Sequence, residues 1–290
     1  MKLVQRIVLT YYVLKLKIIE RFSKTTAAKS AFELFCTPYT RSRKLVVPKV
    51  FEKAENLSIL FNNLQLQGYR WKPIKPNGQR LLICHGFDSM SYKYAYFIEP
   101  LLQAGFEVLA FDAPAHGNSS GKTITALLYK DAIIHLNNLY GTLDIIMAHS
   151  FGCIAASLAV EQSLTSLQKL VLIAPATETT RSIDDFAKFL KLSSPLKKAM
   201  ENLIVEIGGK DPSWYSVARI VKTLTIKTLW LHDKQDTITP YKDMEYLTNI
   251  PLPNVEFIIT TGMGHSLYRK KEVADKILEW MIQSENKKTS

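Results

Sequence analysis

Hydrophobic residues follow two different patterns on the two sides of residue 50. Within residues 1–24 they recur every three or four positions, with no Gly or Pro, which predicts an amphipathic helix. The recurring residues are Leu3, Ile7, Tyr11, Leu14, Ile18 and Phe22. From about residue 51 onward, short uncharged runs alternate with longer segments of helical periodicity, so this part predicts strands that alternate with helices.

The second part of the chain predicts an α/β fold. Residues 57–61 and 64–73 read as paired strands with a turn at Asn62-Asn63. Further buried strands are predicted within 80–86, 106–117, 143–150, 169–176, 227–233 and 255–262, and helices within 91–105, 125–141, 153–163, 241–249 and 270–283. Strands and helices in this alternation form a mostly parallel central sheet with helices on both faces.

A helical insertion interrupts the alternation at residues 176–225. It contains two stretches of helical composition, 182–192 and 194–207, and lies between two predicted sheet strands. Open α/β sheets bind ligands at the carboxyl ends of their strands, so we expect this insertion to be a cap or lid over a pocket. The chain then divides into an N-terminal helical segment (1–50), a core (51–175 and 226–290) and the cap (176–225).

The positive charge of the chain is concentrated at its N-terminus. The net charge is +11, but residues 1–49 hold eleven of the 37 basic residues and two of the 26 acidic ones, which leaves +2 for the rest. The uncharged run within residues 1–24 is too short to cross a bilayer, and Lys15 and Lys17 interrupt the apolar block that a signal peptide needs. Two interpretations stay open: the apolar face binds an anionic membrane surface, or it packs on the protein's own core.

Cysteine usage and known motifs narrow the class of protein. Cys36, Cys84 and Cys153 have neither the spacing of a zinc site nor the number of a disulfide framework, so we expect a cytoplasmic protein, peripheral at the inner face of the membrane if residues 1–24 bind lipid. We expect no cofactor and no metal, because the sequence has no P-loop, dinucleotide fingerprint or HExxH motif. Nucleic acid is not an expected partner, because no recognition fold accompanies the basic residues.

The predicted strand at 143–150 ends abruptly at a serine between small residues. In the segment AHSFG, Ala148 stands two residues before Ser150 and Gly152 two residues after it. Small residues at these positions permit the sharp strand–serine–helix turn called a nucleophile elbow, whose backbone is strained and closely approached by its neighbours. Ser150 would then begin a helix whose N–H groups and dipole stabilise a developing anion.

A histidine and two aspartates are placed to act with Ser150. A nucleophilic serine needs a base, and the base needs a carboxylate that orients it. His265 follows the last predicted strand in TTGMGHSL, and Asp233 and Asp236 follow the strand before it in LHDKQDTITP. Positions that follow parallel strands meet at one edge of the sheet, so these side chains can converge on Ser150. The spacing alone leaves both aspartates open as the acid.

Four motifs between about residues 57 and 283 resemble those of the α/β-hydrolase superfamily. CHGFDS is similar to the superfamily's HGx oxyanion loop, and FDAPAHGNSSG to its D-x-P-G-H-G-x-S loop, with Ala115 where glycine is usual. AHSFG resembles the elbow, and HDKQDTITP with GMGH resembles the acid and base positions. The resemblance therefore implies the α/β-hydrolase fold with a helical cap.

The same resemblance implies a role for each matched residue. It makes Ser150, Asp236 and His265 a catalytic triad, with Asp236 chosen over Asp233 because it stands four residues before Pro240. The oxyanion donors would be the backbone N–H groups of Phe87 and Phe151. Supporting roles, in bracing or packing the site, fall to His85, Gly86, Asp112 and His149.

The implied activity is that of a serine esterase or lipase-like enzyme. Ser150 would attack the carbonyl carbon of a small-molecule ester or acyl compound, lipid-like esters included, and water would release the acyl group. A thioesterase, amidase or acyltransferase would use the same triad. A protein of this fold that only binds its ligand is a further alternative, because fold does not dictate function.

Overall fold

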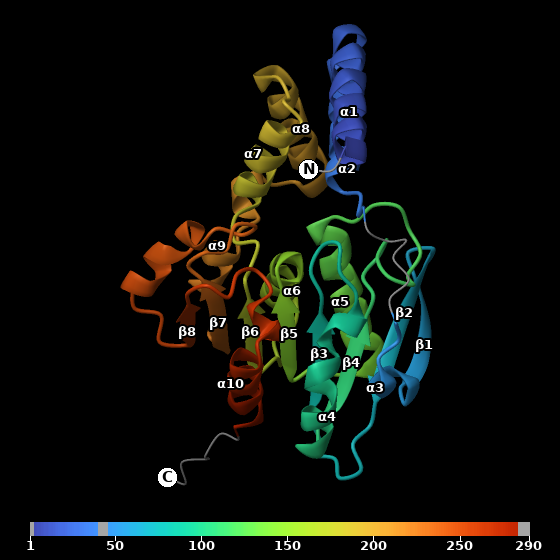
Figure 1. The fold of residues 1–290 in the computed structure, drawn as a ribbon. Coiled ribbons are helices and arrows are strands. Elements are labelled where there is room, and N and C mark those ends of the chain that lie inside the picture. The colour runs from blue at the N-terminus through green and yellow to red at the C-terminus, as the bar shows by residue number, and fades with distance from the viewer. Residues whose placement is uncertain (1–2, 40–45, 284–290) are drawn as a thin grey trace.

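The computed structural model describes residues 3–39 and 46–283, and it contains one eight-stranded sheet (Figure 1). The order of the strands is β1-β2-β4-β3-β5-β6-β7-β8. From β4 to β8 all neighbours run parallel, whereas β1 and β2 are antiparallel additions at one edge. The bounds are β1 Glu55–Phe61, β2 Leu64–Trp71, β3 Arg80–Cys84, β4 Glu107–Phe111, β5 Ile145–His149, β6 Lys169–Ile173, β7 Lys227–Asp233 and β8 Val255–Thr260. The expected mostly parallel sheet is confirmed.

Helices cover both faces of this sheet, and each face buries its own hydrophobic cluster. Successive residues of a strand point to opposite faces, so Leu82 packs with α5 (Ala126–Tyr140) and α6 (Phe151–Gln162). Its neighbours Leu81 and Ile83 pack on the other face with α4 (Ala95–Gln103) and α10 (Lys271–Ile282). Strands buried on both faces explain the uncharged runs of the sequence. The α/β-hydrolase fold expected from the motifs is the fold observed.

Two local predictions have different outcomes. The hairpin between β1 and β2 does turn at Asn62-Asn63, whose φ values of 47° and 60° are those of a type I′ turn. The prediction of one helix over 241–249 is wrong. The chain forms two short 3₁₀ helices, Tyr241–Asp243 and Glu245–Asn249, because Met244 between them leaves the helical conformation (φ −121°, ψ −9°) while its side chain is fully buried.

The helices beyond the carboxyl ends of the strands come from two distant parts of the sequence. Figure 1 shows α1 (Leu3–Phe22) and α2 (Lys24–Phe35) rising beside α7 (Thr179–Phe189) and α8 (Ser194–Gly208). Helix α2 packs against both α1 and α8. The division of the chain into domains stays a prediction, but the N-terminal hairpin and the insertion are in direct contact. The short helices are α3 Lys49–Glu52, α9 Val217–Val221, and the 3₁₀ turns Ser91–Tyr94, Pro212–Trp214 and Leu267–Arg269.

Helix α1 packs on α2 with a different face from the one that the sequence singled out. Leu16 is buried, and Leu9, Tyr12, Val13 and Ile19 pack beside it. The predicted stripe is exposed instead, at Ile7, Tyr11, Leu14, Ile18 and Phe22, while the side chain of Leu3 lies outside the described residues. Helix α1 therefore does pack on the protein's own core, as one interpretation held, but the prediction that the stripe is the packing face is wrong. In the described ranges, no helix has the length and apolar character needed to span a membrane.

Close packing of α2 gives a test of how firmly the hairpin belongs to the fold. Ala31 on α2 is completely buried, so Ala31→Leu forces extra atoms into a filled space. We expect it to lower the free energy of unfolding by about 1–3 kcal/mol, measured by urea denaturation. Lys29→Leu, at an exposed position of the same helix, is the control and should change the stability little. If Ala31→Leu and the native chain have equal free energies of unfolding, the packing of α2 on its neighbours does not stabilise the fold.

Candidate active site

Ser150 occupies a strained turn between β5 and α6. Its backbone angles are φ 54° and ψ −119°, a region that non-glycine residues rarely adopt. The turn is held by two backbone hydrogen bonds: Ser150 N–H donates to Ile173 O (2.9 Å), and Ala176 N–H donates to Ser150 O (3.1 Å). At Gly152 a Cβ atom would lie 2.6 Å from His85 O and 2.7 Å from Cys84 O, so no larger residue fits there. This is the elbow geometry that the sequence predicted.

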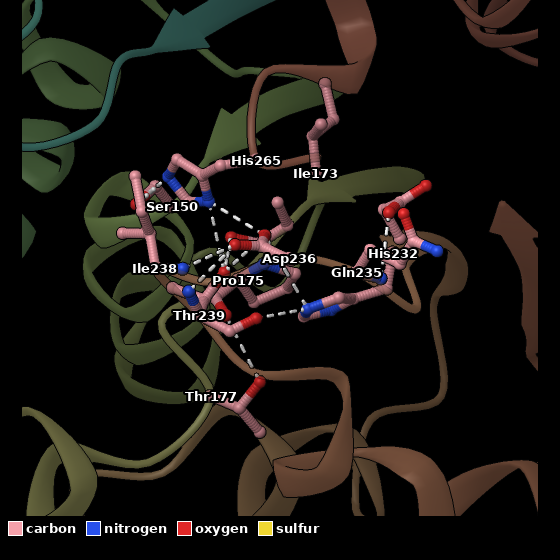
Figure 2. Close-up of polar contacts among 12 residues, drawn as sticks. Ser150, Ile173, Pro175, Thr177, His232, Gln235, Asp236, Ile238, Thr239 and His265 are labelled. Carbon is pink, nitrogen blue, oxygen red and sulfur yellow. Dashed lines mark hydrogen bonds and ion pairs between the residues drawn. The ribbon is translucent and has the colours of Figure 1, made fainter. Parts of the chain in front are cut away.

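Three side chains from three separate loops form one hydrogen-bonded chain (Figure 2). His265, after β8, places Nε2 3.0 Å from Ser150 Oγ. Its Nδ1 lies 2.8 Å from Asp236 Oδ2, in the loop after β7. With this arrangement the imidazole can take the hydroxyl proton of Ser150 while the carboxylate stabilises the cation that results.

The Asp236 carboxylate is buried but remains ionised. Burial opposes its charge, yet hydrogen bonds from His265, Thr239 and Ile238 outweigh that effect and lower its pKa to about 2. Oδ1 accepts from the backbone N–H groups of Ile238 (2.8 Å) and Thr239 (3.0 Å). These bonds leave Oδ2 to face the imidazole, so the loop itself fixes the orientation of the acid.

Thr239 is a residue of the site that sequence reasoning missed. Its hydroxyl lies 2.9 Å from Asp236 Oδ2, 3.1 Å from His265 Nδ1 and 3.2 Å from Ala174 O (Figure 2). The hydroxyl therefore lies between the acid, the base and the end of β6. Its only signal in the sequence is its position three residues after Asp236, which is the spacing of a side-chain-capped turn.

Asp233, the alternative acid, has different partners. It accepts from Thr260 Oγ1 (2.7 Å) and from the backbone N–H groups of Met263 and Gln235 (both 2.9 Å). Burial opposes its charge, but these bonds outweigh it and lower its pKa. Asp233 thus ties the end of β7 to the loop that carries His265, and the geometry brings Asp236 rather than Asp233 to the imidazole.

The two expected oxyanion donors lie beside Ser150 in the wall of a cavity. The rings of Phe87 and Phe151 meet edge to face at 5.6 Å, and both side chains line that cavity. Phe151 is the first residue of α6, so its N–H has no partner within the helix. At Gly86 a Cβ atom would lie only 2.9 Å from Ser150 Cβ, so the loop before Phe87 passes close to the serine. The oxyanion role of the two N–H groups stays a prediction.

His85 stabilises the loop that carries Gly86 and Phe87. Its Nε2 accepts the backbone N–H of Ala113 (2.9 Å), so Nδ1 carries the proton and donates to Gly86 O (2.8 Å). Burial keeps the pKa of His85 well below its usual value, which preserves this neutral form. Asp112 is fully buried and accepts hydrogen bonds from Ser91 N–H (2.9 Å) and Asn118 N–H (2.9 Å). It therefore joins the segment after β3 to the loop after β4.

His149 and Cys153 flank Ser150 but do not reach into its hydrogen-bonded chain. His149 Nε2 lies 3.1 Å from His265 O, and its ring packs on the rings of His265 and Tyr268 at 4.7 and 4.8 Å. Burial lowers the pKa of His149 to about 3, so it is neutral above that pH. Burial also raises the pKa of the Cys153 thiol well above its usual value, which makes it a poor nucleophile.

An apolar cavity of about 350 Å³ opens at Ser150. Its walls come from the core, from the 176–225 insertion and, unexpectedly, from α2, which contributes Phe32 and Phe35. The residues of the insertion that line it include Thr179, Ser182, Phe186, Ile204 and Ile207. The insertion therefore lies where a lid was expected. Across the described ranges, no group of three or more His, Cys, Asp or Glu side chains is placed to hold a metal ion.

Comparison with known families and curated proteins gives partial matches. The family described as "Serine aminopeptidase, S33" matches residues 75–218, a range that contains Ser150 but ends before Asp236 and His265. Bifunctional epoxide hydrolase 2 of Sus scrofa is 33% identical over 81 residues, which make up 26% of this chain. The matched segment spans 15% of the length of that protein.

Solved structures match over most of the chain at low identity. The esterase Pf2001 of Pyrococcus furiosus superposes with a TM-score of 0.63 at 21% identity, covering 85% of this chain and 96% of the esterase. A membrane phospholipase A, described as a bacterial virulence factor, superposes with a TM-score of 0.59 at 18% identity and covers 96% of this chain and 99% of its own. These likenesses concern the fold.

The buried histidines predict an acid-sensitive stability. Burial lowers the pKa values of His85, His149 and His232, so below about pH 6.5 the unfolded chain binds protons that the folded chain does not. The free energy of unfolding should therefore fall as the pH is lowered from about 6.5 toward 3. For His149→Phe this slope should be smaller by up to about 1.4 kcal/mol per pH unit, measured by urea denaturation. Above about pH 7 the two curves should run parallel; identical slopes below it would contradict the prediction.

Proposed function

We propose that this chain, which has the α/β-hydrolase fold and is similar over residues 75–218 to the family described as "Serine aminopeptidase, S33", is a serine hydrolase that cleaves carboxylic esters. The observation that carries the proposal is the Ser150–His265–Asp236 chain, with Oγ–Nε2 and Nδ1–Oδ2 distances of 3.0 and 2.8 Å, whose serine lines an apolar cavity. An apolar cavity accepts the acyl chain of an ester and leaves the carbonyl group beside Ser150.

In the proposed reaction, His265 Nε2 takes the proton of Ser150 as Oγ attacks the carbonyl carbon of the ester. The oxyanion that forms is stabilised by the N–H groups of Phe87 and Phe151. His265 then gives its proton to the leaving alcohol, which frees the acyl-enzyme. A water molecule, deprotonated by the same imidazole, releases the acid and restores Ser150. Throughout, Asp236 holds the Nδ1–H of His265 and stabilises the imidazolium.

The proposed substrate is a small-molecule ester with one apolar acyl chain. The lining of the cavity is predominantly apolar and includes the aromatic residues Phe32, Phe35 and Phe186. The esterase and the membrane phospholipase A among the structural neighbours support an ester bond, whereas the family description "Serine aminopeptidase" keeps an amide bond as the alternative. The proposed location is the cytoplasm, because all three cysteines are buried free thiols, as in proteins of a reducing compartment.

Ester hydrolysis by a Ser150→Ala variant tests the proposal directly. Loss of the nucleophile should lower kcat on p-nitrophenyl esters by on the order of 10⁴-fold or more, and it should abolish labelling by a fluorophosphonate probe. Ser157→Ala is the matched control, since Ser157 is a buried serine on the same helix and lies outside the cavity lining. If the native protein hydrolyses no ester and is not labelled by the probe, the result favours the alternative that the protein binds a ligand without catalysis. If the native protein turns over only thioesters or only amides, that class of compound replaces carboxylic esters as the proposed substrate.

The cavity predicts a preference for acyl chain length that one residue of α8 controls. Ile207 and Val205 are both partly exposed on α8, but only Ile207 lines the cavity. Ile207→Trp should narrow the cavity and lower kcat/KM for long-chain p-nitrophenyl esters on the order of tenfold relative to acetate, which corresponds to one or two lost methylene contacts. Val205→Trp should leave the ratio unchanged. Equal effects of the two substitutions would show that the acyl chain lies elsewhere.

A further inference from the structure

The outward face of α1 carries an apolar stripe that the fold leaves uncovered. The exposed fractions are 84% for Phe22, 60% for Ile7 and Ile18, 59% for Tyr11 and 54% for Leu14. These residues stand three or four positions apart, so they form one continuous row along the helix. A soluble monomer rarely exposes a contiguous apolar row of this kind without a partner for it.

Helix α1 packs on its neighbours with another face, so the stripe is not needed for that packing. A second apolar row, centred on the buried Leu16, already fixes α1 against its neighbours. Glu20 lies on the inward side, where it accepts a hydrogen bond from the hydroxyl of Ser193 at the start of α8. Because the inner row suffices to dock α1, the outer row contributes nothing to the described fold.

Basic side chains border the stripe on both sides. At 100° per residue, Lys15 lies on one flank of the row, and Arg6, Lys17 and Arg21 lie on the other. All four are exposed. The one acidic residue of α1 is Glu20, which faces α8. An apolar row with one cation on one flank and three on the other fits a surface that offers hydrocarbon beneath negative charge.

We propose that α1 binds the surface of an anionic phospholipid membrane, lying in the plane of the interface with its stripe among the acyl chains. A second copy of this chain fits the stripe less well, because each copy would bring the same cations to the contact. Of the net charge of +11, residues 1–49 carry +9, so association of two such segments is opposed by their own repulsion.

This membrane contact is connected to the cavity by direct packing. Helix α1 packs on α2, and α2 supplies Phe32 and Phe35 to the cavity wall. The exposed side chains of Tyr39, Ile207 and Ile238 also line the cavity and give it an apolar rim. The inference deepens the proposed function, on which this part rests: the ester is a lipid ester taken from the membrane to which α1 is bound.

Flotation with lipid vesicles tests the binding without any turnover. The full chain should float with vesicles of mixed phosphatidylcholine and phosphatidylglycerol, and on the order of 100-fold less with phosphatidylcholine alone, since each basic residue at an anionic surface adds about fivefold. Leu14→Gln/Ile18→Gln should abolish flotation by removing the apolar contact. Lys15→Glu/Lys17→Glu/Arg21→Glu should abolish it by reversing the charge.

Matched controls separate α1 from the rest of the surface. Ile74→Gln/Leu139→Gln removes two apolar residues that are as exposed as those of the stripe but lie outside α1, and Lys53→Glu/Lys75→Glu/Lys276→Glu reverses three exposed charges elsewhere. Both controls should float like the native chain. Failure of the native chain to float, or equal loss in a control, would overturn the proposal. So would a dimer in size-exclusion chromatography that Leu14→Gln/Ile18→Gln dissociates, because the stripe would then bind a second copy.

The failure of this inference can be distinguished from the failure of the proposed function. Ser150→Ala protein should float as well as the native chain, whether or not esters are hydrolysed. The Leu14→Gln/Ile18→Gln variant should keep its activity on a soluble acetate ester and lose any increase in rate that anionic vesicles give on a long-chain ester. Unchanged vesicle activation in this variant would overturn the link between α1 and the cavity.

Discussion

Ser150 can keep its unusual backbone angles only because the chain around it has no room to relax. A positive φ at a serine costs on the order of 1–3 kcal/mol, which surrounding contacts must offset. Here the serine N–H donates to the end of β6, and Gly152 brings α6 against the carbonyl groups of Cys84, the last residue of β3, and of His85. The same close contact fixes Ser150 Oγ at the carboxyl edge of the sheet. Each other part of the site is placed relative to that fixed atom.

Asp236 and His265 reach Ser150 because they follow strands that belong to the same parallel sheet as β5. Parallel pairing of β6 with β7 and of β7 with β8 brings the loops after β7 and β8 to the same edge. Short-range hydrogen bonds then aim the side chains: Asp236 is oriented by the N–H groups of its own loop, and Thr239 joins that loop to the end of β6. The parallel sheet brings these loops to one edge, and hydrogen bonds within the loops set the final positions of the side chains.

The sequence was most informative where one local pattern admits one structure. Uncharged runs ending at small residues predicted the parallel strands and the elbow. The spacing left Asp233 and Asp236 both open, and only the resemblance to the superfamily pattern chose Asp236, four residues before Pro240. Helix α1 shows where such reasoning stops, because it has two apolar rows and periodicity alone does not say which of them packs. Similarly, the apolar residues of 241–249 suggested one helix, whereas the chain forms two 3₁₀ helices that meet at the fully buried Met244. Both outcomes depend on tertiary contacts that no short segment encodes.

The shape of the cavity depends on contacts even more distant in sequence. Phe32 and Phe35 enter its wall because α2 packs on α8, about 170 residues further along the chain. Small buried residues of α2 let the two helices approach, and Glu20 and Ser193 join α1 to the start of α8. The residues that resemble the superfamily motifs therefore determine the chemistry available at Ser150. The walls of the cavity also come from α2 and from the insertion, which those motifs do not include. If the cavity takes the acyl chain that we propose, these two parts of the chain select it.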